Sequence, residues 1–253
     1  MSKLLFAKYE GAGNDFILID DRRLVFSQNP FFIQKLCDRK EGIGADGLIL
    51  LQYPFTMRIF NADGTEADSC GNGLRCFARF LLDLQLPCDR IETKAGPVFA
   101  STFADAIAVD MPQPKQMRLQ LSTDLGVVHF VDSGVPHAVH FAPDPAKINL
   151  SYFGSILRRH AHFQPAGANI SVALCASDGS IAARTFERGV EAETRSCGTG
   201  AVAIAAIARK LYHLQDTIKV IYSGGELLVQ FKRDAVRLIG PARKVFEGIF
   251  LSA

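Results

Sequence analysis

Long apolar runs are missing from this sequence of 253 residues. The longest stretch without a polar side chain covers residues 201–208, and Arg209 ends it. Because a membrane-spanning helix needs about 18 or more apolar residues, this pattern predicts no spanning helix. Residues 1–20 contain charged side chains such as Lys3 and Lys8 and no cleavable apolar core. We therefore expect no secretory signal, no membrane partner and a cytoplasmic location.

An excess of charge of one sign is missing as well. The chain has 28 Lys and Arg residues against 26 Asp and Glu residues, which gives a net charge of +2. A dedicated nucleic-acid-binding protein would carry a basic excess or a basic stripe, so no nucleic-acid partner is expected. Hydrophobic residues make up 48% and charged residues 21%, which excludes intrinsic disorder and is typical of a globular protein with one large or two small domains.

Two of the six cysteines lie in an internal repeat. Residues 58–73 read R-I-F-N-A-D-G-T-E-A-D-S-C-G-N-G, and residues 184–200 read R-T-F-E-R-G-V-E-A-E-T-R-S-C-G-T-G. Both segments have R-x-F, then mostly polar residues, then S-C-G-x-G. The cysteines of the two copies, Cys70 and Cys197, are about half a chain length apart, which predicts two related halves rather than a tandem solenoid.

Each copy of the repeat leads into a predicted helix. Residues 74–82 have apolar side chains at helical spacing, and residues 201–211 are apolar on every face until Arg209, which is typical of a buried helix. Short segments bounded by Gly, Pro or Asp predict strands elsewhere. They cover residues 4–9, 16–20, 48–53, 57–61, 98–103, 106–111, 127–131, 138–141, 170–175, 182–186, 218–222, 227–231 and 236–239.

This pattern predicts an α/β fold of the α+β type. Each of two pseudo-symmetric halves is expected to curl a β-sheet or barrel around one central helix. Strands and helices do not alternate regularly, which makes a doubly wound fold less favoured. The segment Met-Pro-Gln-Pro-Lys at residues 111–115 is the best candidate for the boundary between the halves.

The paired cysteines are the first candidates for chemistry. The start of a helix offers free backbone N–H groups and a positive dipole end, which favour a thiolate and can hold a carboxylate. If two such thiols faced one substrate carbon, one could remove a proton from one face and the other could return a proton to the opposite face. The plain alternative is that Cys70 and Cys197 are small buried residues at tight turns. A zinc site is not expected, because Cys70 and Cys76 lack metal-ligand spacing, and no other metal is predicted.

Two glycine-rich strings leave a nucleotide-binding protein open as an alternative. Residues 42–47 match G-x-G-x-x-G, but no strand precedes them and a strand-like segment follows, so a tight loop is favoured. Residues 198–203 match G-x-G-x-x-A and open a predicted helix. That alternative does not explain why Cys-Gly-x-Gly occurs twice. Arg188 could hold a carboxylate through two hydrogen bonds. His137 and Glu187 are candidates for the site only if the fold brings them near the cysteines.

The motifs together resemble the diaminopimelate epimerase family, amino-acid isomerases that work without pyridoxal phosphate in lysine and peptidoglycan precursor biosynthesis. The similarity covers nearly the whole chain. It is carried by residues 8–16, 39–46, 58–79, 136–139, 169, 187–189, 197–200 and 240–242. The combination of N-A-D-G, C-G-N-G-L-R-C and C-G-T-G is the specific part.

The resemblance implies a domain of residues 1–114 completed by a returning strand in residues 243–253, a second domain of residues 115–242, and an active site in the cleft between them. It implies that Cys70 and Cys197 form an acid/base pair tuned by His137 and Glu187. A small-molecule amino acid would be the substrate, no cofactor would be needed, and a homodimer stays open. The substrate-binding residues it implies are Asn14, Asn61, Gly71, Asn72, Asn169, Glu187, Arg188, Gly198 and Thr199.

Three departures from the family pattern bear on selectivity. Gly47 stands where Gln is usual, Val135 stands where Asn is usual, and the segment 187–197 looks one residue longer. A site with fewer buried polar groups rejects analogues less strongly. The sequence therefore predicts an isomerase that interconverts LL- and meso-diaminopimelate with relaxed specificity. The alternative is a cofactor-independent racemase of another amino acid, such as glutamate.

Overall fold

The structure is a computed structural model that describes residues 2–68 and 70–252. Its contacts divide the chain into two compact units. The first unit is Met1–Val109 together with Gly240–Ala253, and the second is Asp110–Ile239. No helix in these described stretches is long and apolar enough to cross a membrane.

The first unit is an open sheet with two helices. Strands β1, β2, β3 and β4 are neighbours in that order, and β18 pairs with the other edge of β1. Both β5 and β6 pair with β4, and β7 and β8 continue from β6. The elements are β1 (Ser2–Gly11), β2 (Asn14–Asp20), α1 (Pro30–Cys37), β3 (Gly47–Gln52), β4 (Thr56–Asn61), β5 (Glu66–Ala67), α2 (Gly71–Asp83), β6 (Arg90–Thr93), β7 (Gly96–Phe103), β8 (Ala106–Met111) and β18 (Arg243–Ser252).

The second unit repeats this architecture. Strand β9 pairs with β10, and the sheet continues through β11, β12 and β13, which pairs with both β14 and β15, and then through β16 and β17. The elements are β9 (Lys115–Thr123), β10 (Gly126–Asp132), β11 (Pro136–Phe141), η1 (Pro145–Lys147), α3 (Leu150–Leu157), η2 (Ala161–Phe163), β12 (Asn169–Cys175), β13 (Ile181–Glu187), β14 (Ala192–Thr194), α4 (Gly198–Tyr212), β15 (Thr217–Tyr222), β16 (Gly225–Phe231) and β17 (Val236–Gly240).

The internal repeat predicted from the sequence is confirmed strand by strand. The pairs β2–β3, β4–β6, β11–β12 and β13–β15 are parallel, and all the other pairs named above are antiparallel. Strands β1 to β8 therefore correspond in order and direction to β10 to β17. Helices α1 and α2 correspond to α3 and α4, and the outer strand β18 corresponds to β9.

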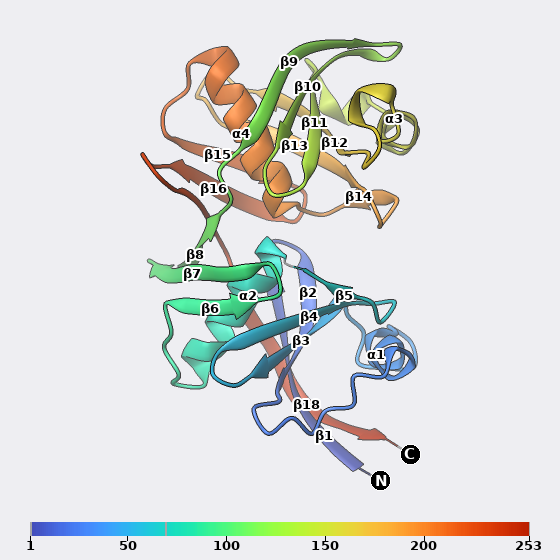
Figure 1. Cartoon of the computed structure of the whole chain (residues 1–253), viewed down its shortest axis with the longest axis vertical. Coiled ribbons are helices and arrows are strands. Elements are labelled where there is room, and N and C mark those ends of the chain that lie inside the picture. The colour runs from blue at the N-terminus through green and yellow to red at the C-terminus, as the bar shows by residue number, and fades with distance from the viewer. Residues whose placement is uncertain (1, 69, 253) are drawn as a thin grey trace. The chain divides into compact units, whose positions relative to one another are not determined.

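Each unit has one buried central helix, as predicted. Helix α4 contacts β10, β11, β12 and β13 on the one hand and β15 and β16 on the other, so its sheet curls around it (Figure 1). Helix α2 contacts β1, β2, β3, β4, β7 and β18 in the same way. The side chains of Ala201–Ala208 in α4 are all buried, because Ala, Val and Ile fill the space inside the sheet without a polar group that needs a partner.

The second helix of each unit packs on the outer face of its sheet. In α1, Ile33 and Leu36 are buried against Ile17, Leu48 and Leu50 of the sheet. In α3, a corresponding cluster joins Leu150, Phe153 and Leu157 to strands β10 to β13. The sheet of each unit is thus covered by a helix on both faces, which explains why residues 48–51 and 170–173 are continuously buried.

Candidate active site

Each central helix begins directly after a cysteine of the repeat. Cys70 is the N-cap residue of α2, and its Sγ accepts a hydrogen bond from the Gly73 N–H at 3.5 Å. Cys197 is the N-cap residue of α4, and its Sγ accepts from the Gly200 N–H at 3.4 Å. Both sulfur atoms therefore lie at the positive end of a helix dipole, the setting that stabilises a thiolate.

In the first unit, Asn14 is the polar neighbour of the candidate thiol. The Asn14 Oδ1 lies 3.9 Å from Cys70 Sγ and accepts a weak hydrogen bond from it. The Asn14 Nδ2 donates to Asp46 at 2.8 Å, which fixes the amide. Gly71 and Asn72 form the first turn of α2 and are buried. The predicted residues Cys70, Asn14, Gly71 and Asn72 therefore meet at one helix start.

Asn61 makes its side-chain hydrogen bond outside this group. It is exposed at the end of β4, where its Nδ2 donates to Thr65 Oγ1 at 3.0 Å in the turn before β5. No hydrogen bond joins Asn61 to Cys70 in the stretches that the structure describes. Its assignment to the distal end of a substrate stays a prediction.

In the second unit, a buried chain of side chains leads to Cys197. The Asn169 Oδ1 accepts from the Arg188 N–H at 2.8 Å, so its Nδ2 faces His137 Nε2 at 3.3 Å and donates to it. The same Nε2 lies 3.0 Å from Thr199 Oγ1, which is 3.5 Å from Cys197 Sγ. The predicted residues His137, Asn169, Arg188, Thr199 and Cys197 thus form one connected network.

His137 is held neutral in this network. Burial, with a smaller contribution from the positive charge of Arg188, lowers the pKa of His137 to about 3. Because its Nε2 accepts from Asn169, the neutral ring carries its proton on Nδ1. This state suits a residue that orients the Thr199 hydroxyl, and it does not suit a proton donor at neutral pH.

Glu187 supplies a carboxylate to the Cys197 thiol. Burial raises the pKa of Glu187, and hydrogen bonds from Thr194 and from Cys197 partly oppose that rise. Glu187 is the last residue of β13, and Thr194, which donates to Glu187 Oε1, is the last residue of β14. A carboxyl group with a raised pKa beside a thiol can take the proton of that thiol.

Three contributors to these networks were not predicted from the sequence. Ser133 Oγ donates to the Thr199 carbonyl at 2.9 Å and fixes the first turn of α4. Tyr222 is buried beside Cys197 and Glu187, and its hydroxyl lies 3.4 Å from Thr185 Oγ1. Arg75 Nη2 donates to Asn72 Oδ1 at 2.9 Å. None of the three stood out in the sequence, and even Arg75 shares its side of the helix with the polar residues Asn72 and Arg79.

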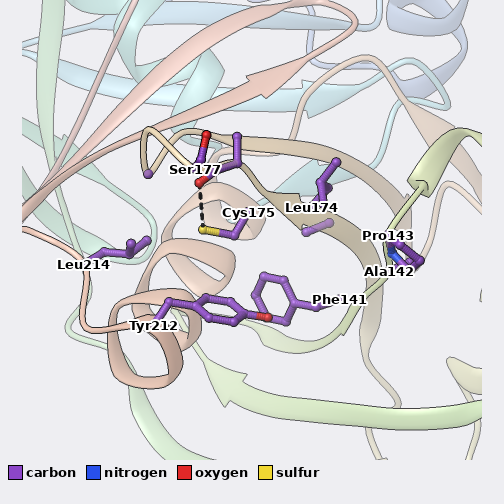
Figure 2. Close-up of a pocket in the computed structure, with 11 residues that line it drawn as sticks. Phe141, Ala142, Pro143, Leu174, Cys175, Ser177, Tyr212 and Leu214 are labelled. Carbon is purple, nitrogen blue, oxygen red and sulfur yellow. Dashed lines mark hydrogen bonds between the residues drawn. The ribbon is translucent and has the colours of Figure 1, made fainter.

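A pocket of about 630 Å³ lies at the other end of α4. Figure 2 shows the rings of Phe141 and Tyr212 below Cys175, with Ser177 above it. Tyr212 ends α4, and a helix of 15 residues is about 20 Å long, so this pocket is remote from Cys197 at the start of the helix. The pocket therefore does not belong to the candidate active site.

Within residues 2–68 and 70–252, no group of three or more His, Cys, Asp or Glu side chains has an arrangement that could hold a metal ion.

Sequence comparison identifies one family. The family model described as diaminopimelate epimerase matches residues 6–117 and 129–245. A protein of a Hydrogenobaculum species with the name diaminopimelate epimerase is 38% identical over an alignment of 272 residues, gaps included. The alignment covers 97% of this chain and 98% of that protein. A protein of the same name from Methanocella arvoryzae is 37% identical, with coverage of 98% and 97%.

Solved structures share the architecture at low identity. A phenazine biosynthesis protein of the PhzF family from Bacillus anthracis superposes with a TM-score of 0.77 at 17% identity and covers 100% of both chains. A hydroxyproline epimerase from Agrobacterium vitis, with bound trans-4-hydroxy-L-proline, gives a TM-score of 0.72 at 17% identity and covers 99% of this chain and 91% of that one. These similarities show a common fold.

Proposed function

The chain belongs to the diaminopimelate epimerase family and is an isomerase, and on that basis we propose that it interconverts LL-2,6-diaminopimelate and meso-diaminopimelate without a cofactor. The observation that carries the proposal is the pair of cysteines, each capping a buried helix at an equivalent place in two units that share one strand order. Inversion at carbon needs a base on one face and an acid on the other. Two equivalent thiols supply both.

In the proposed mechanism, one thiolate takes the α-proton of the substrate and the other thiol gives a proton to the opposite face. One S–H bond forms on the first sulfur and one breaks on the second, so the protons balance. The two sulfurs exchange roles in the reverse reaction. Glu187 activates Cys197 by accepting its proton, which the hydrogen bond between them and the raised pKa of Glu187 support. His137 acts by holding Thr199.

The negative charge that develops next to the α-carbon needs donors. Backbone N–H groups at the start of a helix bind a carboxylate and stabilise it further as it gains charge in the transition state. We assign this role to Gly71 and Asn72 of α2 and to Gly198 and Thr199 of α4. Asn14, Asn61, Asn169 and Arg188 are then left to recognise the remainder of the substrate.

A direct test measures the isomers formed from LL-diaminopimelate by the reduced protein with no cofactor added. We expect meso-diaminopimelate to form. Cys70→Ala and Cys197→Ala should each lower kcat by about 10³-fold or more, the range that follows from loss of an acid or base. Cys175→Ala should keep full activity, because Cys175 lines the pocket at the other end of α4. Full activity of either candidate-cysteine variant contradicts the mechanism.

We also propose relaxed substrate selectivity, which the sequence suggested from two departures, Gly47 and Val135. The structure bears on these two positions differently. A Cβ atom at Gly47 would lie 2.6 Å from the Phe60 carbonyl oxygen, so this glycine has a packing reason of its own. Val135 is half-buried, and its identity is the departure that this packing argument does not explain. The proposal therefore depends on Val135. A kcat/KM for L-glutamate above the buffer background supports it, and restoration of selectivity by Val135→Asn would identify the residue.

A further inference from the structure

Arg75 is a fully buried cation without a carboxylate partner. It lies in α2, its side chain has no exposed surface, and it makes no ion pair within the described stretches of the chain. Its donors reach the Asn72 Oδ1 at 2.9 Å, the Gly71 carbonyl at 3.3 Å and the Pro241 carbonyl at 3.3 Å. Burying a guanidinium costs several kcal/mol unless negative charge compensates it.

The charged groups that face this region are already engaged. Glu10 of β1 is paired with Arg243 at 2.5 Å and accepts from the Gly13 N–H. Asp15 of β2 is paired with Lys8 and Arg39, which hold its pKa well below the usual range although burial opposes them.

The neighbouring cysteine of α2 does not supply the missing charge. Burial raises the pKa of the Cys76 thiol far above neutrality, so Cys76 stays uncharged. Cys70, five residues before Arg75, can also become negative, and it interacts electrostatically with Arg75, as the Glu10 carboxylate does.

We propose that Arg75 is a positioning residue whose buried positive charge stabilises the negative charge that forms at the start of α2. That charge lies on Cys70 Sγ and on the substrate carboxylate held by Gly71 and Asn72, so this inference rests on the proposed function. Arg75 acts through the Asn72 side chain and the Gly71 carbonyl, both of which it binds directly. It also ties these residues to Pro241, where the chain returns to the first unit.

The second unit uses a different device at the equivalent place. The residue five positions after Cys197 is Val202, which is apolar and buried. There, the carboxyl group of Glu187 contacts the thiol instead. The two thiols of a topologically symmetric protein thus have opposite electrostatic partners, a cation for Cys70 and a carboxyl group for Cys197. Arg75 accordingly biases Cys70 towards its thiolate form.

The test measures the rate at which iodoacetamide alkylates Cys70 between pH 5.5 and pH 9.5, with the modified peptide quantified by mass spectrometry. Only the thiolate reacts, so the midpoint of the rate reports its pKa. Arg75→Met is the main variant, because apolar replacement of a buried ion is often tolerated. Arg75→Lys keeps the charge. Arg79→Gln is the matched control, one helical turn further on, where Arg79 Nη2 donates to the Asp105 carbonyl at 2.9 Å.

We expect Arg75→Met to move the Cys70 midpoint upward by about one pH unit, which is a tenfold lower alkylation rate below the midpoint. Arg75→Lys should hold the midpoint within about half a unit and mainly raise KM, and Arg79→Gln should leave it unchanged. An unchanged midpoint in folded Arg75→Met overturns the inference. If Arg75→Met does not fold, a shift of one unit in Arg75→Lys overturns it, because the charge is still present.

This readout needs no substrate. If Arg75→Met leaves the Cys70 midpoint unchanged and the wild-type protein epimerises LL-diaminopimelate, the role of Arg75 is rejected and the proposed function stands. A clear midpoint shift in a protein that does not turn over LL-diaminopimelate rejects the proposed function, and the coupling between Arg75 and Cys70 stands.

Discussion

Single buried polar groups decide the chemistry that each thiol can perform. Around Cys197, Asn169 accepts a hydrogen bond from the Arg188 N–H, which sets the orientation of its amide. The amide then donates to Nε2 of His137, so the proton of the neutral ring lies on Nδ1. The neutral ring is then available to hold Thr199. The hydrogen bond from the Arg188 N–H to Asn169 therefore determines which nitrogen of His137 carries the proton. Replacement of Asn169 should alter the surroundings of the Cys197 thiol through His137 and Thr199.

The first prediction at this scale concerns acid stability. The pKa of His137 is lowered by burial to about 3, below its value in the unfolded chain. When the pH falls below about 6.5, the unfolded chain binds a proton that the folded protein cannot, so stability is lost between pH 6.5 and 3 and is unaffected above pH 6.5. The loss should approach about 1.4 kcal/mol per pH unit.

Urea unfolding of wild-type protein and His137→Gln at pH 7.0, 5.5 and 4.5 isolates this effect, because the carboxylates titrate equally in both proteins. The wild-type free energy of unfolding should fall more steeply with decreasing pH. Parallel pH dependence of the two proteins would show that His137 does not titrate as described.

The sequence could predict the residues that occur in repeated or conspicuous patterns. Cys70 and Cys197 stand out because each follows a serine and precedes Gly-x-Gly and an apolar helix. Ser133 and Tyr222 could not be found in this way, because their roles depend on contacts between strands far apart in the chain. A serine in a turn and a tyrosine in a strand look ordinary until the register is known.

At the scale of helices and strands, the central helices were predictable and the outer helices were not. Both α1 and α3 are only eight residues long, and their signals are Asn29 and Asn149 as N-caps, which also occur in turns. Strand β9 was missed for another reason. Pro112 and Pro114 precede it directly, and they made residues 111–115 look like a linker.

The second prediction tests how α3 packs on its sheet. A Cβ atom at Gly154 would lie 2.4 Å from the Cγ of Phe186, a buried ring that directly precedes Glu187. Gly154→Ala should therefore lower the free energy of unfolding by about 1–3 kcal/mol through overpacking. Ser155→Ala, the exposed neighbour in the same helix, should change it by less than about 0.5 kcal/mol. Equal urea midpoints for both variants would argue against the close packing.

At the scale of the whole chain, the two units differ in how they are completed. The second unit is continuous in sequence, and Arg237 Nε lies 3.3 Å from Asp110 Oδ1, which joins its two ends. The first unit needs its C-terminal segment, because β18 pairs with β1 from Ser2 to Glu10. The repeat alone predicts equal halves, and the returning strand in residues 243–253 was expected only from the family resemblance. Its pairing with β1 joins residues far apart in the chain, so it leaves no local signal in the sequence.

The third prediction follows from this difference. The isolated fragment 110–239 should unfold cooperatively in urea. The fragment 1–109 should show no cooperative transition, because β1 has lost β18 and exposes an edge. Joining residues 240–253 to residue 109 through a flexible Gly/Ser linker should restore the transition. A fragment 1–109 as stable as the linked fragment would contradict the structural need for β18.

The central claim is that two thiols act on opposite faces of one carbon, and the isotope content of the first product tests it most directly. The reduced protein is given LL-diaminopimelate in D₂O, and proton NMR follows both isomers at low conversion. The account predicts that meso-diaminopimelate carries solvent deuterium at the inverted carbon from the first turnover, while the remaining LL isomer keeps its α-proton. Product that retains the substrate proton would mean that a single group removes and returns it, which would contradict the two-thiol mechanism.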